Sequence, residues 1–175
     1  MIRQLTGADA AAFRSLRLEA LQLAPEAYGS TLADWQDEGI DRFAARIADS
    51  WVAGAFDDAL DGGLVGGLVG VAALDRERGA NVRHRGLVTA VYVAPVVRRC
   101  GFALAMLARL AQEAADQGVL QLELQVAAEN RTAMALYEKA GYQRHGLIPR
   151  ALLVQGRFID EVLMIRRLDG DAPKP

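Results

Sequence analysis

Cysteine and histidine are scarce in this sequence. Cys100 is the only cysteine among 175 residues, and there are two histidines. A single cysteine excludes an internal disulfide framework, and it leaves no thiol cluster that could hold zinc. We therefore predict a protein without a metal site, suited to a reducing compartment.

The sequence also lacks an excess of charge of either sign, and it lacks long apolar runs. Its 20 basic and 22 acidic residues leave a net charge of -2 at pH 7, so no overall charge attracts it to nucleic acid or to an anionic membrane. No uninterrupted apolar stretch approaches the roughly 20 residues that a membrane-spanning helix needs. Residues 2–5 lack the basic and then apolar pattern of an export signal. We expect a cytoplasmic protein that binds neither nucleic acid nor membrane.

Apolar residues as a class are plentiful. They make up 52% of the chain, which is enough to build the core of one domain of ordinary size. We predict a single domain over residues 1–168, followed by a short polar tail, residues 169–175, that is disordered.

Hydrophobic periodicity predicts an α/β fold. Apolar residues recur at helical spacing around Phe13 and Leu16, and again around Phe43 and Ile47. Runs rich in valine and leucine lie between and after these stretches and predict strands. The expected order of the first half is a strand at 2–5, a helix that Thr6 and Asp9 cap and that ends near residue 24, a helix at 37–48, an antiparallel hairpin of strands at 51–56 and 64–74, and a strand at 87–93.

The second half of the chain predicts a crossover connection. Apolar residues alternate with polar ones from Leu120 to Val126, which is the period of a strand. This strand follows a helix predicted at 102–117, and that helix follows the strand at 87–93, so the three elements form a parallel β-α-β crossover. A helix at 131–140 and two strands between residues 142 and 168, joined by a turn at 155–156, complete the predicted order.

A cluster of glycines lies within the predicted hairpin. Its members are Gly62, Gly63, Gly66, Gly67 and Gly70. They resemble a phosphate-binding loop, but no Lys followed by Ser or Thr completes a nucleotide site. Bulges or close packing within the hairpin are the favoured interpretation.

The best candidate for a ligand site is the turn Arg98–Ala103, which joins a predicted strand directly to a predicted helix. Unpaired N–H groups at a helix start and the helix dipole attract an anion, and small residues such as Gly101 let phosphate oxygens approach. Arg98 and Arg99 add positive charge. The turn lacks the Gly-Lys-Ser/Thr of a P-loop and the three glycines of the dinucleotide fingerprint. A different phosphate ligand is therefore expected.

Two segments together resemble the GNAT superfamily of acyl-CoA-dependent N-acetyltransferases. The turn resembles the family's acetyl-CoA pyrophosphate signature, Gln/Arg-x-x-Gly-x-Gly/Ala, and Asn130–Tyr142 resembles its segment Asn-x-x-Ala-x-x-Leu-Tyr-x-x-x-Gly-Phe. The resemblance in element order extends over residues 2–168. It implies a mixed, mostly antiparallel sheet flanked by helices and acetyl-CoA as cosubstrate. It also implies that the strands at 87–93 and 120–126 splay apart around the pantetheine arm.

The resemblance implies roles for individual residues. Tyr137 is expected to be the general acid for the CoA thiolate, because a phenol of pKa ~10 is a reasonable donor to a thiolate whose acid has a pKa of about 8.5. The structural alternative is a helical tyrosine packed against the sheet. The cofactor-binding residues that the resemblance implies are Val91, Tyr92, Val93, Arg98, Arg99, Cys100, Gly101, Phe102, Ala103 and Asn130.

The chain departs from the family pattern at three positions. A glycine is common in place of Arg99 and a basic residue in place of Cys100, but the backbone still provides the phosphate cradle. Relatives that acetylate the N-terminus of a ribosomal protein tend to have Leu-Glu-Val where this chain has Leu124–Val126. Because Gln125 cannot accept a proton, a protein N-terminal amine is the less favoured acceptor.

The residues leave the base and the acceptor open. Glu123, His84 or a water that relays the proton to bulk solvent are alternative bases. The candidates for substrate binding are Tyr28, Trp35 and Glu123, and the two aromatic residues suit ordinary packing equally well. We predict direct transfer of an acetyl group to the primary amine of a small molecule, an amino acid or a peptide. A non-catalytic acyl-CoA sensor is the rival function, and the last strands suit a homodimer contact.

Overall fold

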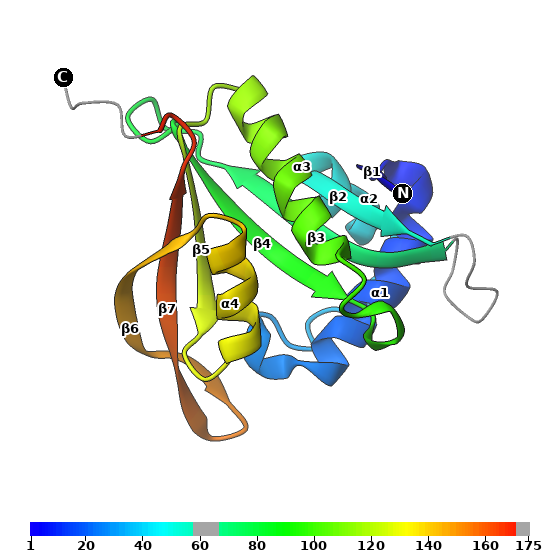
Figure 1. The fold of residues 1–175 in the computed structure, drawn as a ribbon. Coiled ribbons are helices and arrows are strands. Elements are labelled where there is room, and N and C mark those ends of the chain that lie inside the picture. The colour runs from blue at the N-terminus through cyan, green and yellow to red at the C-terminus, as the bar shows by residue number, and fades with distance from the viewer. Residues whose placement is uncertain (58–66, 171–175) are drawn as a thin grey trace.

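A computed structural model describes residues 1–57 and 67–170. Within these residues, seven strands form one sheet that α-helices flank (Figure 1). The elements are β1 (Ile2–Gln4), α1 (Ala10–Leu23), α2 (Ile40–Asp49), β2 (Trp51–Phe56), β3 (Leu68–Arg76), β4 (Arg85–Val93), α3 (Phe102–Asp116), β5 (Gln121–Ala127), α4 (Arg131–Lys139), β6 (Gln143–Val154) and β7 (Arg157–Arg167). The predicted α/β class and the predicted order of strands and helices are confirmed.

The sheet is mixed and mostly antiparallel. Its strand order is β1-β2-β3-β4-β5-β7-β6, and only the neighbours β4 and β5 run parallel among the described strands. Helix α3 joins these two strands, because parallel neighbours need a crossover connection. The predicted β-α-β unit is therefore confirmed. The β6–β7 hairpin turns at Gln155 and Gly156, whose φ angles are 49° and 80°, and it places β7 beside β5.

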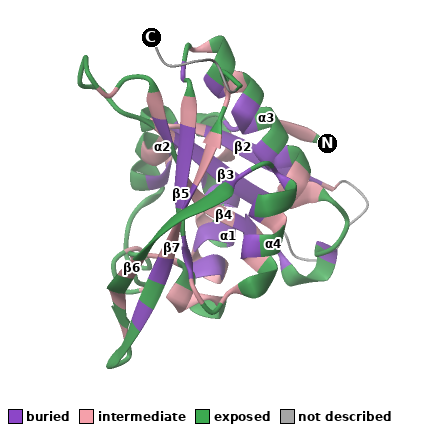
Figure 2. Cartoon of the chain, turned by 60° about the vertical axis from the view of Figure 1, so that its left-hand side comes forward, coloured by how far each residue is buried: buried purple, intermediate pink, exposed green. Residues whose placement is uncertain are grey.

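Helices cover both faces of the sheet. Figure 1 shows α3 and α4 in front of the sheet and α1 and α2 behind it. The inward stripes are apolar: α1 buries Phe13 and Leu16, and α3 buries Met106, Leu107 and Leu110. Strands β2 and β3 are buried along most of their length because helices lie on both sides of them (Figure 2). Strand β6, in contrast, is largely exposed at the sheet edge.

A capping box precedes α1, as predicted. The Thr6 N–H donates to the Asp9 carboxylate at 2.8 Å, and Arg3 forms an ion pair with the same carboxylate at 2.7 Å. The hydrogen-bonded Arg3 guanidinium lowers the pKa of Asp9 to about 2, so this cap is ionised at neutral pH. The contacts join β1 to the start of α1.

Two predictions extend beyond the described residues. Strand β3 begins at Leu68, so the predicted strand start at residue 64 and the glycines at positions 62, 63 and 66 lie outside the described residues. Close packing is observed at Gly70, where an added Cβ would lie 3.0 Å from Met106 Cε and 3.1 Å from the Tyr92 carbonyl oxygen. Of the predicted tail, residues 171–175 also lie outside.

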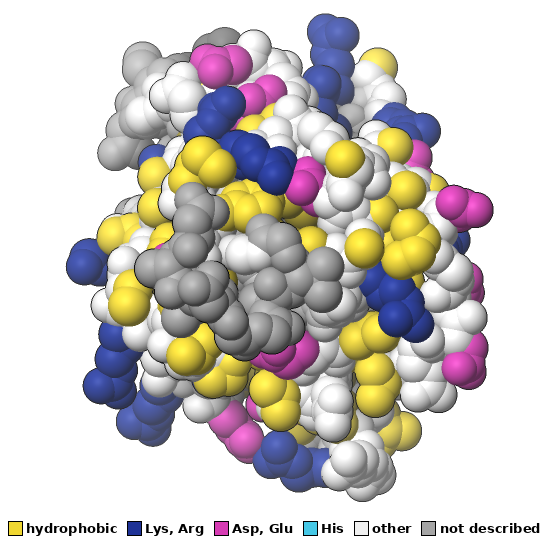
Figure 3. Space-filling view, turned by 90° about the vertical axis from the view of Figure 1, so that its right-hand side faces the viewer, with side chains coloured by type: hydrophobic (Ala, Val, Ile, Leu, Met, Phe, Trp, Pro, Cys, Tyr) yellow, Lys and Arg dark blue, Asp and Glu magenta, His cyan; other side chains and the backbone are white. Residues whose placement is uncertain are grey.

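Surface charge is mixed. Figure 3 shows basic and acidic side chains interspersed on one face of the molecule. In the part of the chain that the structure describes, no helix is long and apolar enough to cross a bilayer. The same part contains no group of three or more His, Cys, Asp or Glu residues placed to hold a metal ion.

Candidate functional site

The turn Arg98–Ala103 forms a backbone cradle at the start of α3. Arg99 and Gly101 have φ angles of 67° and 86°, and such alternation makes successive N–H groups converge on an anion. The first intrahelical bond runs from the Ala105 N–H to the Gly101 carbonyl oxygen, so the N–H groups just before it point outward along the helix axis. The space beside Gly101 is open, because an added Cβ would meet no atom within 4 Å.

The side chains of this turn lie at or near the surface. Arg98 Nε donates to the Val93 carbonyl oxygen at 3.1 Å, and its guanidinium lies 5.9 Å from the centre of the Tyr92 ring. Of the other residues of the turn, Arg99, Cys100 and Gly101 are exposed, and Phe102 and Ala103 are half-buried. The cradle therefore combines backbone donors, a fixed cation and free space.

Strands β4 and β5 separate beside the cradle. The two strands pair at three positions, Arg85 with Gln121, Gly86 with Leu122 and Leu87 with Glu123. Strand β4 continues to Val93 and β5 to Ala127, with no further pair between them among the described residues. The predicted separation of these two strands is observed.

A β-bulge lies in β4 where the strands have separated. Ala72 of β3 lies opposite two residues, Ala90 and Val91, and Ala90 has a φ angle of 54°. A bulge bends its strand and redirects the local backbone groups. The Val91 carbonyl oxygen accepts a hydrogen bond from the Tyr28 hydroxyl at 3.2 Å. Here β4 therefore contacts the segment that follows α1.

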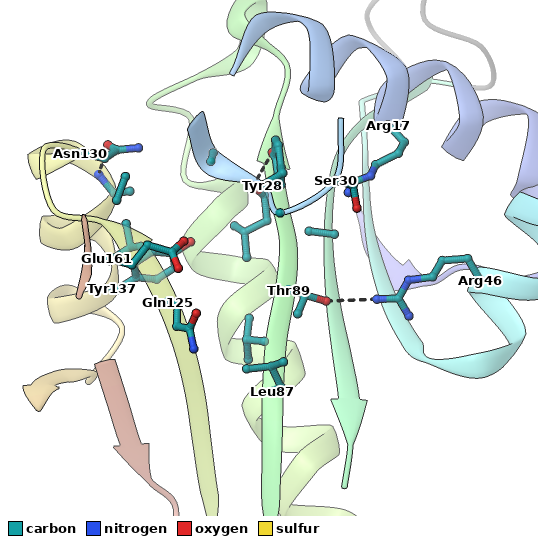
Figure 4. A pocket seen from close by; sticks show the side chains of 18 of the residues that line it. Arg17, Tyr28, Ser30, Arg46, Leu87, Thr89, Gln125, Asn130, Tyr137 and Glu161 are labelled. Carbon is teal, nitrogen blue, oxygen red and sulfur yellow. Dashed lines mark hydrogen bonds between the residues drawn. The ribbon is translucent and has the colours of Figure 1, made fainter. Parts of the chain in front are cut away.

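The gap opens into a cavity of about 400 Å³ (Figure 4), a volume that suits a small molecule. Residues of α1, α2, α4, β4, β5 and β7 line it, together with the segment after α1. Of the residues predicted from the sequence, Tyr28, Trp35, Val91, Asn130 and Tyr137 belong to this lining, whereas Tyr92, Val93 and Glu123 do not. The structure thus brings residues of β4, of the Asn130–Tyr142 segment and of the segment after α1 to one site, whereas no residue of the turn Arg98–Ala103 lines the cavity.

Helix α4 contributes Tyr137 and Asn130. The Tyr137 side chain is buried, and its ring meets Tyr142 edge-on with 5.9 Å between ring centres. Burial raises the pKa of Tyr137, so its hydroxyl keeps the proton at neutral pH. Asn130 also caps α4, because its Oδ1 accepts a hydrogen bond from the Ala133 N–H at 3.0 Å.

Glu123, one of the predicted bases, is held by other contacts. Its carboxylate accepts hydrogen bonds from Arg85 at 2.5 and 2.6 Å and from Gln121 at 2.7 Å. The Arg85 bond in particular lowers the pKa of Glu123, which makes it a weak base. On the same face of β5, Gln125 reaches the cavity instead, and His84 does not line it.

Glu161 is a cavity carboxylate that the sequence reasoning missed. It lies on β7 opposite Ala127 of β5, is 8% exposed, and faces the cavity beside Tyr137 (Figure 4). None of the described residues forms a hydrogen bond or ion pair with its carboxylate, and burial raises its pKa. Spacing in the sequence indicated its position. Glu161 follows Ile159 by two residues and so lies on the same, buried face of the strand, where a glutamate is rare.

Tyr92 and Val93 lie beside the cavity. The Tyr92 hydroxyl donates to the Glu19 carboxylate at 2.7 Å, and Val93 packs against the core. Their side chains are therefore engaged with the fold. Their backbone follows the part of β4 that has left β5.

Solved structures share this fold over nearly the whole chain. A ribosomal-protein-alanine N-acetyltransferase from Brucella melitensis is 24% identical, with 95% of this chain and 99% of that chain covered and a TM-score of 0.77. A phosphinothricin acetyltransferase from Sinorhizobium meliloti, solved in complex with acetyl-CoA, is 21% identical, with 100% and 92% covered and a TM-score of 0.82. A GNAT-family acetyltransferase from Streptococcus pneumoniae is 20% identical, with 95% and 98% covered and a TM-score of 0.80.

These identities are low enough that the structural likeness shows the fold alone. A search of curated proteins by sequence gave no match. The match to a protein family is more specific, because the model of the acetyltransferase (GNAT) family aligns with residues 17–142. This segment spans well over half of the chain and contains the cradle, the strand gap and all of α4. The chain belongs to the GNAT family of acetyltransferases.

Proposed function

We propose that this protein transfers an acetyl group from acetyl-CoA to a primary amine by direct attack. The observations that carry the proposal are the gap between β4 and β5, which opens into a cavity lined by Tyr137 and Glu161, and the backbone cradle that follows the end of β4. An extended phosphorylated thioester fits this arrangement, with its phosphates at the cradle and its acyl group in the cavity.

The proposed binding of the acetyl donor, acetyl-CoA, follows from charge and backbone geometry. The pyrophosphate binds the N–H groups of residues 101–104, where the helix dipole adds about half a positive charge. Arg98, the first residue of the turn, adds its own charge, and Arg99 and Cys100 contribute mainly backbone groups. The pantetheine arm lies along the edge of β4 at Val91–Val93, where β4 has no pair with β5. The amide groups of the arm take the place of the missing strand.

The acceptor end requires a base, an oxyanion site and an acid. Glu161 takes a proton from the ammonium form of the acceptor, and the neutral nitrogen attacks the thioester carbonyl carbon. Backbone N–H groups of β4 near the bulge stabilise the oxyanion. The C–S bond then breaks, Tyr137 donates its proton to the departing thiolate, and the attacking nitrogen loses its second proton, which returns Tyr137 to its neutral form and leaves the neutral amide. The raised pKa values of Glu161 and Tyr137 favour these two assignments, because a base needs proton affinity and an acid must hold its proton.

The test is release of free CoA from acetyl-CoA in the presence of a panel of primary amines. We expect Tyr137→Phe to lower kcat by about 10²-fold and to leave the KM for acetyl-CoA nearly unchanged. Tyr142→Phe is the matched control, because the Tyr142 ring packs against the Tyr137 ring, but its hydroxyl is buried and has no hydrogen-bond partner among the described residues. Full activity of Tyr137→Phe would remove this residue from the mechanism.

A sensor that binds acyl-CoA without turnover is the second candidate. It predicts tight acetyl-CoA binding and no CoA release with every amine in the panel. The Glu161 carboxylate, which has no partner among the described residues, favours the enzyme, because burying such a group costs stability and groups of this kind cluster at catalytic sites.

A further inference from the structure

Arg17 is a buried cation in the cavity wall. It lies on α1, is 8% exposed, and lines the cavity opposite the strands. Its guanidinium is 4.6 Å from the centre of the Tyr28 ring and 5.8 Å from that of Trp35. Its Nη1 atom is buried and has no hydrogen-bond partner among the described residues.

The charge of Arg17 is not balanced within the part of the chain that the structure describes. No carboxylate of the described residues forms an ion pair with it, and burial is the main cause that lowers its pKa. Arg46, a second arginine in the lining, adds a like charge nearby. Arg46 is itself balanced, because both of its terminal nitrogens bond to the Asp75 carboxylate, at 2.7 and 2.9 Å. The α1 side of the cavity therefore has a surplus of positive charge.

The opposite side of the cavity has the opposite charge. Figure 4 shows Glu161 beside Tyr137 on one side and Arg17 with Arg46 on the other, with Tyr28 between them. Both Arg17 and Glu161 are buried, and neither has an ionic partner among the described residues. A buried guanidinium without an acceptor is costly, whereas one that binds a carboxylate through two parallel N–H groups is strongly stabilised.

We propose that the acceptor is an amine that also carries a carboxylate, with the carboxylate bound by Arg17 and the amine facing Glu161. This inference rests on the proposed function and narrows its substrate class to free amino acids and compounds of the same charge pattern. The Tyr28 and Trp35 rings hold the guanidinium by cation–π contact, and these contacts leave Nη1 without a hydrogen-bond partner among the described residues. A peptide N-terminus fits less well, because its α-carboxyl group is part of an amide bond and carries no charge.

The experiment compares each of the twenty common amino acids with its own carboxamide in the CoA-release assay. Wild-type protein should prefer the acid over the carboxamide by at least about tenfold in kcat/KM, which is about 1.4 kcal/mol, since the carboxamide cannot form a charged hydrogen bond with Arg17. Arg17→Met should remove this preference, because it should raise the KM for the acid by a much larger factor than the KM for the carboxamide. Arg109→Met is the control, because it removes the same charge from an exposed i,i+4 pair on α3.

A structural role of Arg17 predicts a different result. Arg17→Met would then lower activity on acids and carboxamides equally, and this outcome overturns the proposal. Equal use of acids and carboxamides by the wild-type protein overturns it as well, and that comparison needs no variant. Faster turnover of an amidated peptide with a free N-terminus than of any free amino acid would overturn it too.

Binding separates this inference from the proposed function. Calorimetry with N-acetyl amino acids and their carboxamides, in the presence of CoA, measures recognition of the carboxylate without turnover. Carboxylate binding that depends on Arg17, with no CoA release from any acceptor, would support the anion site and reject the transferase. CoA release from amines without any preference for a carboxylate would support the transferase and reject the anion site. The absence of both binding and turnover would reject both the anion site and the transferase.

Discussion

The Tyr28 hydroxyl donates a hydrogen bond to the Val91 carbonyl oxygen, 3.2 Å away and 63 residues further along the chain. The bond joins the segment after α1 to β4 at its bulge, and so joins the proposed acceptor side of the cavity to the proposed donor side. Burial raises the pKa of Tyr28 to about 12, so the phenol stays a donor throughout the neutral range.

Tyr28→Phe should remove this bond and keep the ring beside Arg17. We expect the free energy of unfolding to fall by about 1 kcal/mol and the KM for the acceptor to rise several-fold, because the segment is less firmly held over the cavity. Urea denaturation and acceptor kinetics measure the two effects. Unchanged values of both would mean that the bond contributes nothing in solution.

Gly101 should be needed for its conformation and for the space beside it. Gly101→Ala places a side chain at φ 86°, which costs about 1–2 kcal/mol, and puts a methyl group where the phosphates bind. Gly118, at the other end of α3, has φ 75° and equally open space, so Gly118→Ala is the matched control. Both variants should lose similar stability, but only Gly101→Ala should raise the KM for acetyl-CoA. Equal KM values would place the pyrophosphate elsewhere.

Glu161 should make stability depend on pH. Burial raises its pKa in the folded protein, so folding favours the protonated form. The penalty is absent below the ordinary carboxyl pKa, develops as the pH rises through the raised pKa, and is complete above it. Glu161→Gln should therefore be more stable than wild type at pH 7 and should lose this advantage in acid, as thermal melts at several pH values will show.

The same variant tests catalysis. At saturating acceptor, the kcat of the wild type should fall as the pH is lowered, because Glu161 becomes protonated. Glu161→Gln should have a low kcat that does not fall further at acidic pH for this reason. Glu123→Gln is the matched control on β5, because Glu123 is paired with Arg85 outside the cavity lining. If Glu123→Gln loses activity and Glu161→Gln does not, the base assignment is wrong.

Asn130 combines a cap with a place in the cavity wall, and two substitutions separate these roles. Asn130→Ala removes the acceptor for the Ala133 N–H and should cost about 1 kcal/mol of stability. Asn130→Asp keeps the acceptor and should keep the stability. If Asn130→Asp also keeps the KM for acetyl-CoA, the cap is the main contribution of this residue. A raised KM at wild-type stability would indicate direct contact with the cofactor.

Much of the fold was predictable because its signals are local. The alternation of apolar and polar residues from Leu120 to Val126 specifies a strand whatever that strand packs against. The Thr6–Asp9 capping box forms within one turn of the chain. The cradle and the Asn130–Tyr142 segment were predictable for the same reason, since each depends on the order of neighbouring residues. The local patterns in the sequence do not predict that β7 lies between β5 and β6, because strand order depends on contacts between distant segments.

By itself, the sequence determined the order of the elements, the helix-start cradle and the resemblance to one family of acetyltransferases. Only the tertiary structure decided which charged groups are available for chemistry. Packing gave Glu123 a partner in Arg85 and gave Arg46 a partner in Asp75. It gave no such partner to Arg17 or Glu161 among the described residues, and it placed both in one cavity. The physical reason is that an ion pair forms between segments far apart in the chain, so the fold alone determines which charges stay unpaired.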